Sequence, residues 1–137
     1  MSMPIVDKAA VITNLRRIAN RLNLPVQVQD TYPSNDDNVA YGVYVNEIFF
    51  YTRQPYQLGV QKCGSIYTAT DRLNILYVSY QNDPQAATVL TAINELAADS
   101  SFWDGYHEVD FIVDRTFGAR NEIYTYLFDL KRMDFNV

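Results

Sequence analysis

Apolar residues recur at helical spacing near the N-terminus of the 137-residue chain: Val11, Leu15, Ile18 and Leu22. Steps of three and four positions place side chains on one face of a helix. The pattern predicts a helix over residues 4–22, which Pro4 or Asp7 could begin. Pro25 ends it, because a proline disfavours helical geometry in the residue before it.

A second helical pattern occupies "NDPQAATVLTAINELAAD", where Asp83 is a candidate N-cap and Pro84 suits the first turn. Its predicted apolar stripe consists of Val89, Leu90, Ile93, Leu96 and Ala97. The following "SSFWDG" contains no helical period and ends the helix.

Alternating and β-branched segments predict four or five strands: residues 26–29, 39–52, 66–80, 106–115 and 121–133. Asn46 and Glu47 indicate a turn or bulge within the second of these strands. The stretch "RQPYQLGVQKCGS", residues 53–65, has a proline, two glycines and no period. It is therefore predicted to be irregular, and long loops are often functional. We expect it to form an extended arm or hairpin that contacts a neighbouring protein rather than its own domain.

The last strand has two different faces. Its apolar face carries Tyr124, Tyr126, Phe128 and Leu130. The opposite face carries Thr125, Asp129 and Lys131, with Leu127 as the exception. We expect the apolar face to pack under the helices, which leaves the charged face to meet solvent or a partner.

These elements predict a single α+β domain over residues 1–137. Two amphipathic helices would pack on one face of a mainly antiparallel sheet, in the order α-β-β-β-α-β-β, with the arm at about residues 53–65. The composition, 48% hydrophobic and 20% charged, is that of a globular chain with one core.

Charge and hydropathy narrow the classes of partner. The net charge is −5 and no basic run is present, which argues against sequence-independent binding to nucleic acid. The longest apolar stretches have the length of strands, so no membrane span is expected. The first residues, "MSMPIVDKAA", lack the layout of a secretory signal.

Residues that could carry chemistry are few. His107 is the only histidine and Cys63 the only cysteine, and no motif surrounds either of them. Glu108, Asp110 and Asp114 share one strand face and could bind a cation, but a solvated strand face explains them equally well. The sequence therefore predicts no catalytic residue, no metal site and no cofactor.

Eleven tyrosines are the compositional exception. Some reflect the preference of tyrosine for strands, but tyrosine is also enriched at protein interfaces. Tyr51, Tyr56 and Tyr67 flank the predicted loop. With Asp129 and Lys131 of the last strand, they form the candidate interface.

The chain resembles the tail terminator (tail completion) proteins of tailed bacteriophages over nearly its whole length. The similarity rests on the segments "VITNLRRIANRLNL", "LNILYVSYQNDPQAATVLTAINEL" and "VDFIVDRTFGARNEIYTYLFDLKRMD" and on the order of elements. It implies a homohexameric ring in the virion that caps the tail tube and binds tail tube and neck proteins. DNA would pass through the lumen without specific binding. Head–tail connector proteins are similar in the same respects.

Two other classes of function compete with this interpretation. The first is a small enzyme that uses Cys63, His107 or the row of carboxylates. The second is a monomeric binding module with a groove lined by tyrosines. The mass of the protein in solution would separate a ring from either.

Overall fold

The computed structural model describes residues 3–32, 41–58, 61–118 and 121–135, and the side chains of these residues except 57–65 and 135. This part of the chain contains two helices, α1 (Lys8–Arg21) and α2 (Ala86–Ala98). Its six strands are β1 (Val28–Gln29), β2 (Gly42–Val45), β3 (Phe49–Leu58), β4 (Gln61–Tyr80), β5 (Glu108–Phe117) and β6 (Asn121–Phe135). The predicted loop at 30–38 lies mostly outside the described residues.

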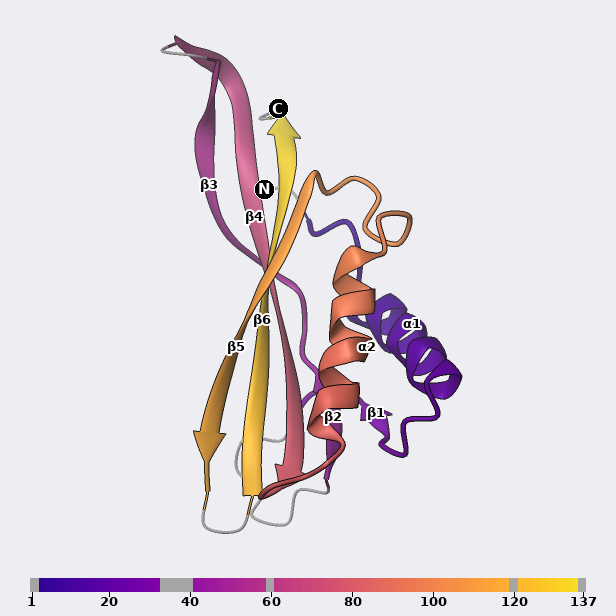
Figure 1. The fold of residues 1–137 in the computed structure, drawn as a ribbon. Helices are drawn as coiled ribbons and strands as arrows, with labels where there is room; N and C mark the ends of the chain where they lie inside the picture. The colour runs from indigo at the N-terminus through magenta and orange to yellow at the C-terminus, as the bar shows by residue number, and fades with distance from the viewer. Residues whose placement is uncertain (1–2, 33–40, 59–60, 119–120, 136–137) are drawn as a thin grey trace.

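The strands form one sheet in the order β1-β2-β4-β6-β5, and β3 pairs with β4. Every pairing is antiparallel except that between β1 and β2. Both helices lie on one side of the sheet, and the β3–β4 hairpin extends beyond them (Figure 1). The predicted α+β class is confirmed, with one strand more than expected because the described part of the segment predicted at 39–52 contains β2 and the start of β3.

The two longest strands form the spine of the sheet. β4 pairs with β6 without interruption from Ile66 to Tyr80, so each residue of one strand has a fixed partner on the other. Alternation places one set of side chains on the helix side of the sheet, where all are buried: Leu73, Ile75, Tyr77, Tyr126, Phe128 and Leu130. Tyr124 packs against this core in a half-buried position. The predicted apolar face of the last strand is confirmed.

Helix α1 begins after Asp7, whose carboxylate accepts a hydrogen bond from the backbone N–H of Ala10 at 2.9 Å. This bond satisfies one of the free N–H groups at a helix start, so Asp7 rather than Pro4 is the N-cap. The helix ends at Arg21, ahead of Pro25 as predicted.

Helix α2 begins later than predicted. Gln85 is its N-cap, and the Asp83 carboxylate instead accepts hydrogen bonds from the backbone N–H of Gln85 and the Tyr77 hydroxyl. The proposed capping role of Asp83 is therefore wrong, because a turn separates it from the helix. Leu90 is also misassigned: it is exposed, and Ala92 occupies the core side of the helix.

The segment after α2 contributes to the core, which the sequence pattern missed. Trp103 is buried and donates its indole N–H to the carbonyl of Leu96 at 2.7 Å. Tyr106, predicted to begin a strand, lies in a turn and is also buried, and β5 begins at Glu108. Gly105, which lies between Trp103 and Tyr106, has a φ of 98°, a conformation that residues with a Cβ rarely adopt.

The predicted break at Asn46 and Glu47 is confirmed, since β2 ends at Val45 and β3 begins at Phe49. For residues 53–65, the expected irregular backbone is wrong, whereas the expected hairpin is confirmed. β3 continues through Pro55 to Leu58 and pairs with β4, so this region is a β-hairpin. Proline is accepted there because β3 is an edge strand, where its missing N–H removes no ladder bond.

We expect the Phe128→Ala variant to lose about 3–5 kcal/mol of unfolding free energy, because Phe128 is fully buried between the rings of Phe111 and Trp103. Asp129→Ala, which changes the opposite face of β6, should alter the stability of the monomer by less than about 0.5 kcal/mol. Chemical denaturation of both variants measures the difference. Equal losses would show that the assigned register of β6 is wrong.

Candidate assembly surface

The sheet face turned away from the helices, here called the outer face, carries the charged side of β6. Arg72 of β4 lies opposite Asp129 of β6 in the strand register, and Lys131 lies between Thr70 and Glu108. Near β2 this face is covered, because the ring of Tyr32 packs edge-on against buried Tyr44. The exposed part of the outer face comprises the region around Arg72 and Lys131 and the β5 residues Asp110, Ile112 and Asp114.

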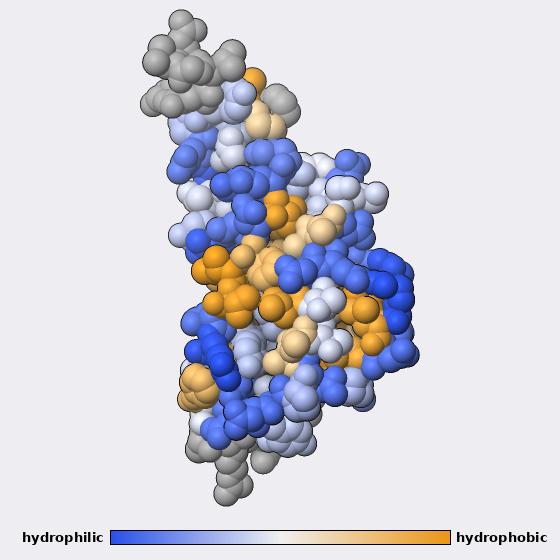
Figure 2. Space-filling view, viewed as in Figure 1, coloured by the Kyte–Doolittle hydropathy of each residue, from blue (hydrophilic) through white to orange (hydrophobic). Residues whose placement is uncertain are grey.

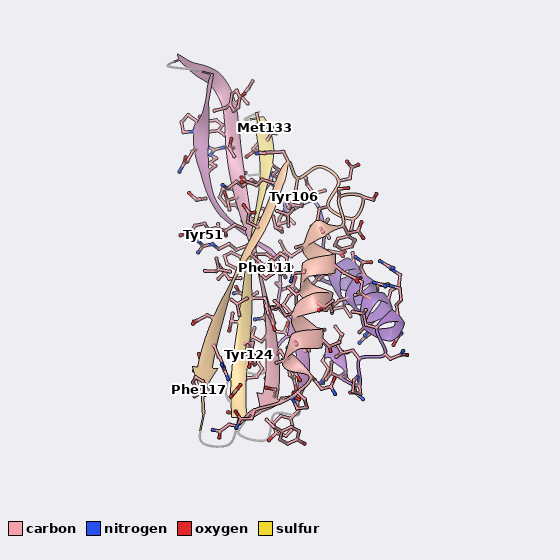
Figure 3. The ribbon with its side chains drawn as sticks, viewed as in Figure 1. Tyr51, Tyr106, Phe111, Phe117, Tyr124 and Met133 are labelled. Atoms are coloured by element: carbon pink, nitrogen blue, oxygen red, sulfur yellow. The ribbon has the colours of Figure 1, made fainter. Side chains whose placement is uncertain are left out.

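Arg72 joins two residues of the candidate interface. Its Nε donates a hydrogen bond to Asp129 Oδ1 at 3.0 Å, and its guanidinium carbon lies 3.4 Å from the centroid of the Tyr51 ring. Figure 3 shows Tyr51 on the side of the crossing strands away from α2. A guanidinium can bind a carboxylate with its edge while its plane stacks on an aromatic ring. The sequence analysis missed Arg72, although it is the only cation in the strand predicted at 66–80.

Lys131 forms an ion pair with Glu108 across β5 and β6, at 2.9 Å between Nζ and Oε2. The hydrogen bond from Lys131 lowers the pKa of Glu108 below its usual 4.5, and the same bond raises the pKa of Lys131. Both side chains remain accessible to solvent. The pair therefore presents one cation and one anion that a neighbouring protein could meet.

The tyrosines of the candidate interface do not all share a face. Tyr56 and Lys131 both line a shallow hollow between β3 and the end of β6, on the outer face. Tyr67 lies on the helix side of the sheet, where the guanidinium of Arg53 stacks 4.3 Å from its ring centroid. Tyr51, Tyr56, Asp129 and Lys131 are thus brought together, and Tyr67 is not.

The residues considered for chemistry are separated. His107 is exposed beside Lys131, whose strand partner is Thr70. Cys63 precedes Thr70 by seven residues in β4, a separation of roughly 23 Å at about 3.3 Å per strand residue. The side chain of Cys63 is outside the described set. Among the described residues, no group of three or more His, Cys, Asp or Glu side chains could hold a metal ion.

On the helix side, a buried ion pair connects β4 and β6. Arg132 donates from Nε to Asp71 Oδ2 at 2.8 Å, and both side chains are at least 96% buried. The Tyr106 hydroxyl donates to the same carboxylate at 2.7 Å and accepts the backbone N–H of Ile5 at 2.9 Å. Burial and the bond to Asp71 raise the pKa of Tyr106, so its hydroxyl keeps the proton that it donates.

No helix within the described ranges has the length and apolar character needed to cross a membrane. No protein-family model and no curated protein matches the chain.

Two ion pairs join β4 to β6 on opposite faces of the sheet, Arg132–Asp71 and Arg72–Asp129, which permits a matched test. Arg132→Met leaves the Asp71 carboxylate buried without its cation, and we expect a loss of about 3–5 kcal/mol of unfolding free energy. Arg72→Met breaks the more exposed pair with Asp129 and should cost at most about 1 kcal/mol. Urea denaturation of both variants provides the comparison. Similar losses would contradict the assigned difference in burial.

We expect Glu108 to titrate below 4.5 in the folded protein and closer to 4.5 in the Lys131→Met variant. Because its folded-state pKa is lowered, the stabilising effect of the pair is present above pH 4.5 and is lost as the pH falls through the folded-state pKa. NMR titration of the Glu108 carboxyl group measures the shift. The Lys131→Arg variant should retain the low pKa, and a wild-type midpoint at 4.5 would disprove the pairing.

Proposed function

We propose that the chain is a structural subunit of a tailed-bacteriophage virion, a tail terminator that forms a ring, caps the tail tube and joins it to the neck. The proposal extends the resemblance in element order and composition. The α+β domain, with two helices covering one face of its sheet, suits such a subunit because the opposite face is left for contacts.

The observation that carries the proposal is the composition of the outer face. Arg72 and Lys131 alternate there with Asp129 and Glu108, and Tyr51 supplies an exposed aromatic ring. A surface with both charge signs and an amphipathic ring suits recognition of a protein with complementary charges. Complementary charges of this kind disfavour wrong partners and fix the register of the contact.

A ring requires two different surfaces on each subunit, because every copy meets one neighbour on each side. The outer face supplies one surface in this proposal. The β3–β4 hairpin supplies the other, since it extends past the helices and could reach an adjacent subunit (Figure 1). The net charge of −5 suits a lumen through which DNA passes, because an acidic wall repels phosphate.

The proposal predicts a ring, with six copies as the expected number. Native mass spectrometry and electron microscopy of the purified chain should detect the ring, alone or after addition of tail tube protein, and tube growth should stop. A strict monomer that leaves tube growth unchanged would disprove the terminator role. Binding to the head portal but not to the tail tube would favour a head–tail connector instead.

Charge pairing at the outer face should control ring formation. Asp129→Ala and Lys131→Ala should each weaken assembly, and added salt should weaken the wild-type contact. Asp104→Ala is the control, because Asp104 is an exposed carboxylate in the turn after α2, away from this face. An equal effect of all three substitutions would remove the outer face from the contact.

A further inference from the structure

Strand β5 forms an edge of the sheet whose backbone groups lack a strand partner on one side. It pairs only with β6, and the backbone N–H of Gly118 donates to the carbonyl of Asn121 at 2.8 Å, where the two strands meet. Backbone groups in an antiparallel ladder point alternately toward and away from the partner strand. Counting back from Gly118, the residues whose N–H and C=O point to the free edge are Val109, Phe111, Val113, Arg115 and Phe117.

The edge of β5 lacks bulges and prolines, two of the features that usually prevent strands from pairing with other chains, although it carries charged side chains. Its register with β6 runs from Glu108 to Phe117 without a bulge, and it contains no proline or glycine. β3, at another edge, has two register shifts and Pro55. Bulges and prolines block the addition of a strand. The fold therefore protects β3 and leaves β5 available.

Apolar side chains are exposed along the same strand. Ile112 is 66% exposed, Val113 46% and Phe117 62%. Figure 2 shows hydrophobic surface on the side of the molecule where β5 lies, and Figure 3 places Phe117 at the end of β5 far from the loop that follows α2. A regular edge strand with exposed apolar residues favours association with another strand.

We infer that β5 pairs antiparallel with β5 of a second copy of this chain, about a twofold axis through Val113. In this register Val113 faces Val113 of the other copy, Phe111 faces Arg115, and Val109 faces Phe117. The outward-pointing residues are symmetric about Val113, so all of their free N–H and C=O groups pair. An isologous contact of this kind requires the same strand from both copies.

The charges of β5 select this register. A shift of the axis to Ile112 places Asp110 opposite Asp114 of the other copy, and a shift to Asp114 places two Asp114 carboxylates together. Like charges directly opposite one another destabilise a strand pair. With the axis at Val113, Asp110 faces Thr116 and Asp114 faces Ile112, so no carboxylate faces another. Self-complementary charge is the reason to assign a second copy rather than a different protein.

A hollow in the monomer lies where the register places Phe117 of the second copy. Phe117 shares the helix side of β5 with Val109, and the hollow beside Val109 is lined by Ala97 and Ala98 of α2 together with Trp103 and Tyr106. Ser100, His107 and Glu108 complete the lining, and the exposed phenyl ring of the second copy would cover its apolar part. The contact closes on itself and uses neither the β3–β4 hairpin nor the outer-face residues Arg72, Asp129 and Lys131, so it is independent of the proposed ring.

Single cysteines test the register in a Cys63→Ser background. In Val113→Cys the two Cα atoms should lie about 5.5 Å apart, within the range of a disulfide. Mild oxidation should therefore convert most of this variant into a covalent dimer. Ile112→Cys is the matched control: its side chain is more exposed, but across the twofold axis the two Cα atoms lie about 8 Å apart, beyond that range. Equal cross-linking of the two variants, or none in Val113→Cys, would overturn the proposal.

A second pair of variants tests the contact without oxidation. Val113→Lys sets two ammonium groups opposite each other and should weaken the β5-linked dimer by about tenfold or more. Val113→Thr keeps the β-branched shape and should preserve it. Native mass spectrometry from micromolar to millimolar protein measures the dimer, and circular dichroism verifies that both variants fold. Absence of a dimer in the wild type, or persistence of the dimer in Val113→Lys, would disprove the pairing. Whether the ring forms is a separate result, because the ring does not use the β5 contact.

Discussion

The buried ion pair between Asp71 and Arg132 constrains how the two longest strands align. Side chains alternate between the faces of a sheet, so a slip of one residue would move either charge to the outer face and leave the other buried alone. A buried charge that has lost its partner is strongly unfavourable. The same slip would expose Phe128 and Leu130. Polar and apolar constraints therefore favour one register, and that register places Arg72 opposite Asp129 on the other face.

The ion pair also marks the boundary between two parts of the sheet. From Asp71 toward Tyr80, the helix side of β4 is covered by α1 and α2 and is lined with apolar residues. Toward Ile66, the strand leaves the helices, and its helix-side residues are the small, buried Ala69 and then half-buried Tyr67. Tyr106 lies at this boundary, where its hydroxyl donates to the Asp71 carboxylate and accepts from the backbone N–H of Ile5. The hairpin thus projects from the part of the sheet that the helices cover.

Periodic sequence patterns predicted those parts of the fold in which one face of a single helix or strand is buried. The alternation from Tyr124 to Leu130 and the helical spacing from Val11 to Ile18 both identified core residues, because burial on a single face leaves a local pattern. Residues 53–65 were misinterpreted as irregular because a proline and two glycines resemble a loop, whereas the pairing of β3 with β4 depends on the partner strand. Local sequence carries no signal for such a partner.

The same limit explains the unpredicted contacts. Trp103 and Tyr106 lie in a turn without a period, and only the packing of α2 on the sheet gives them a core position. Arg72 joins the candidate interface because Asp129 and Tyr51 contact it from two other strands. The sequence could identify the charged side of β6 as a candidate surface, but the pairing of its charges follows from a register that tertiary contacts set.

Edges and faces then limit how copies of the chain can associate. A sheet with two unprotected edges could add strands indefinitely, which is the geometry of fibres. Here β3 carries bulges and Pro55 and β1 is only two residues long, whereas β5 is regular and has charges that are compatible with its own sequence. A β5 contact about a twofold axis occupies the free β5 edge of both copies, so no further strand can be added at that edge. Growth into a larger assembly must therefore use the outer face or the hairpin, where side chains rather than backbone groups determine the partner.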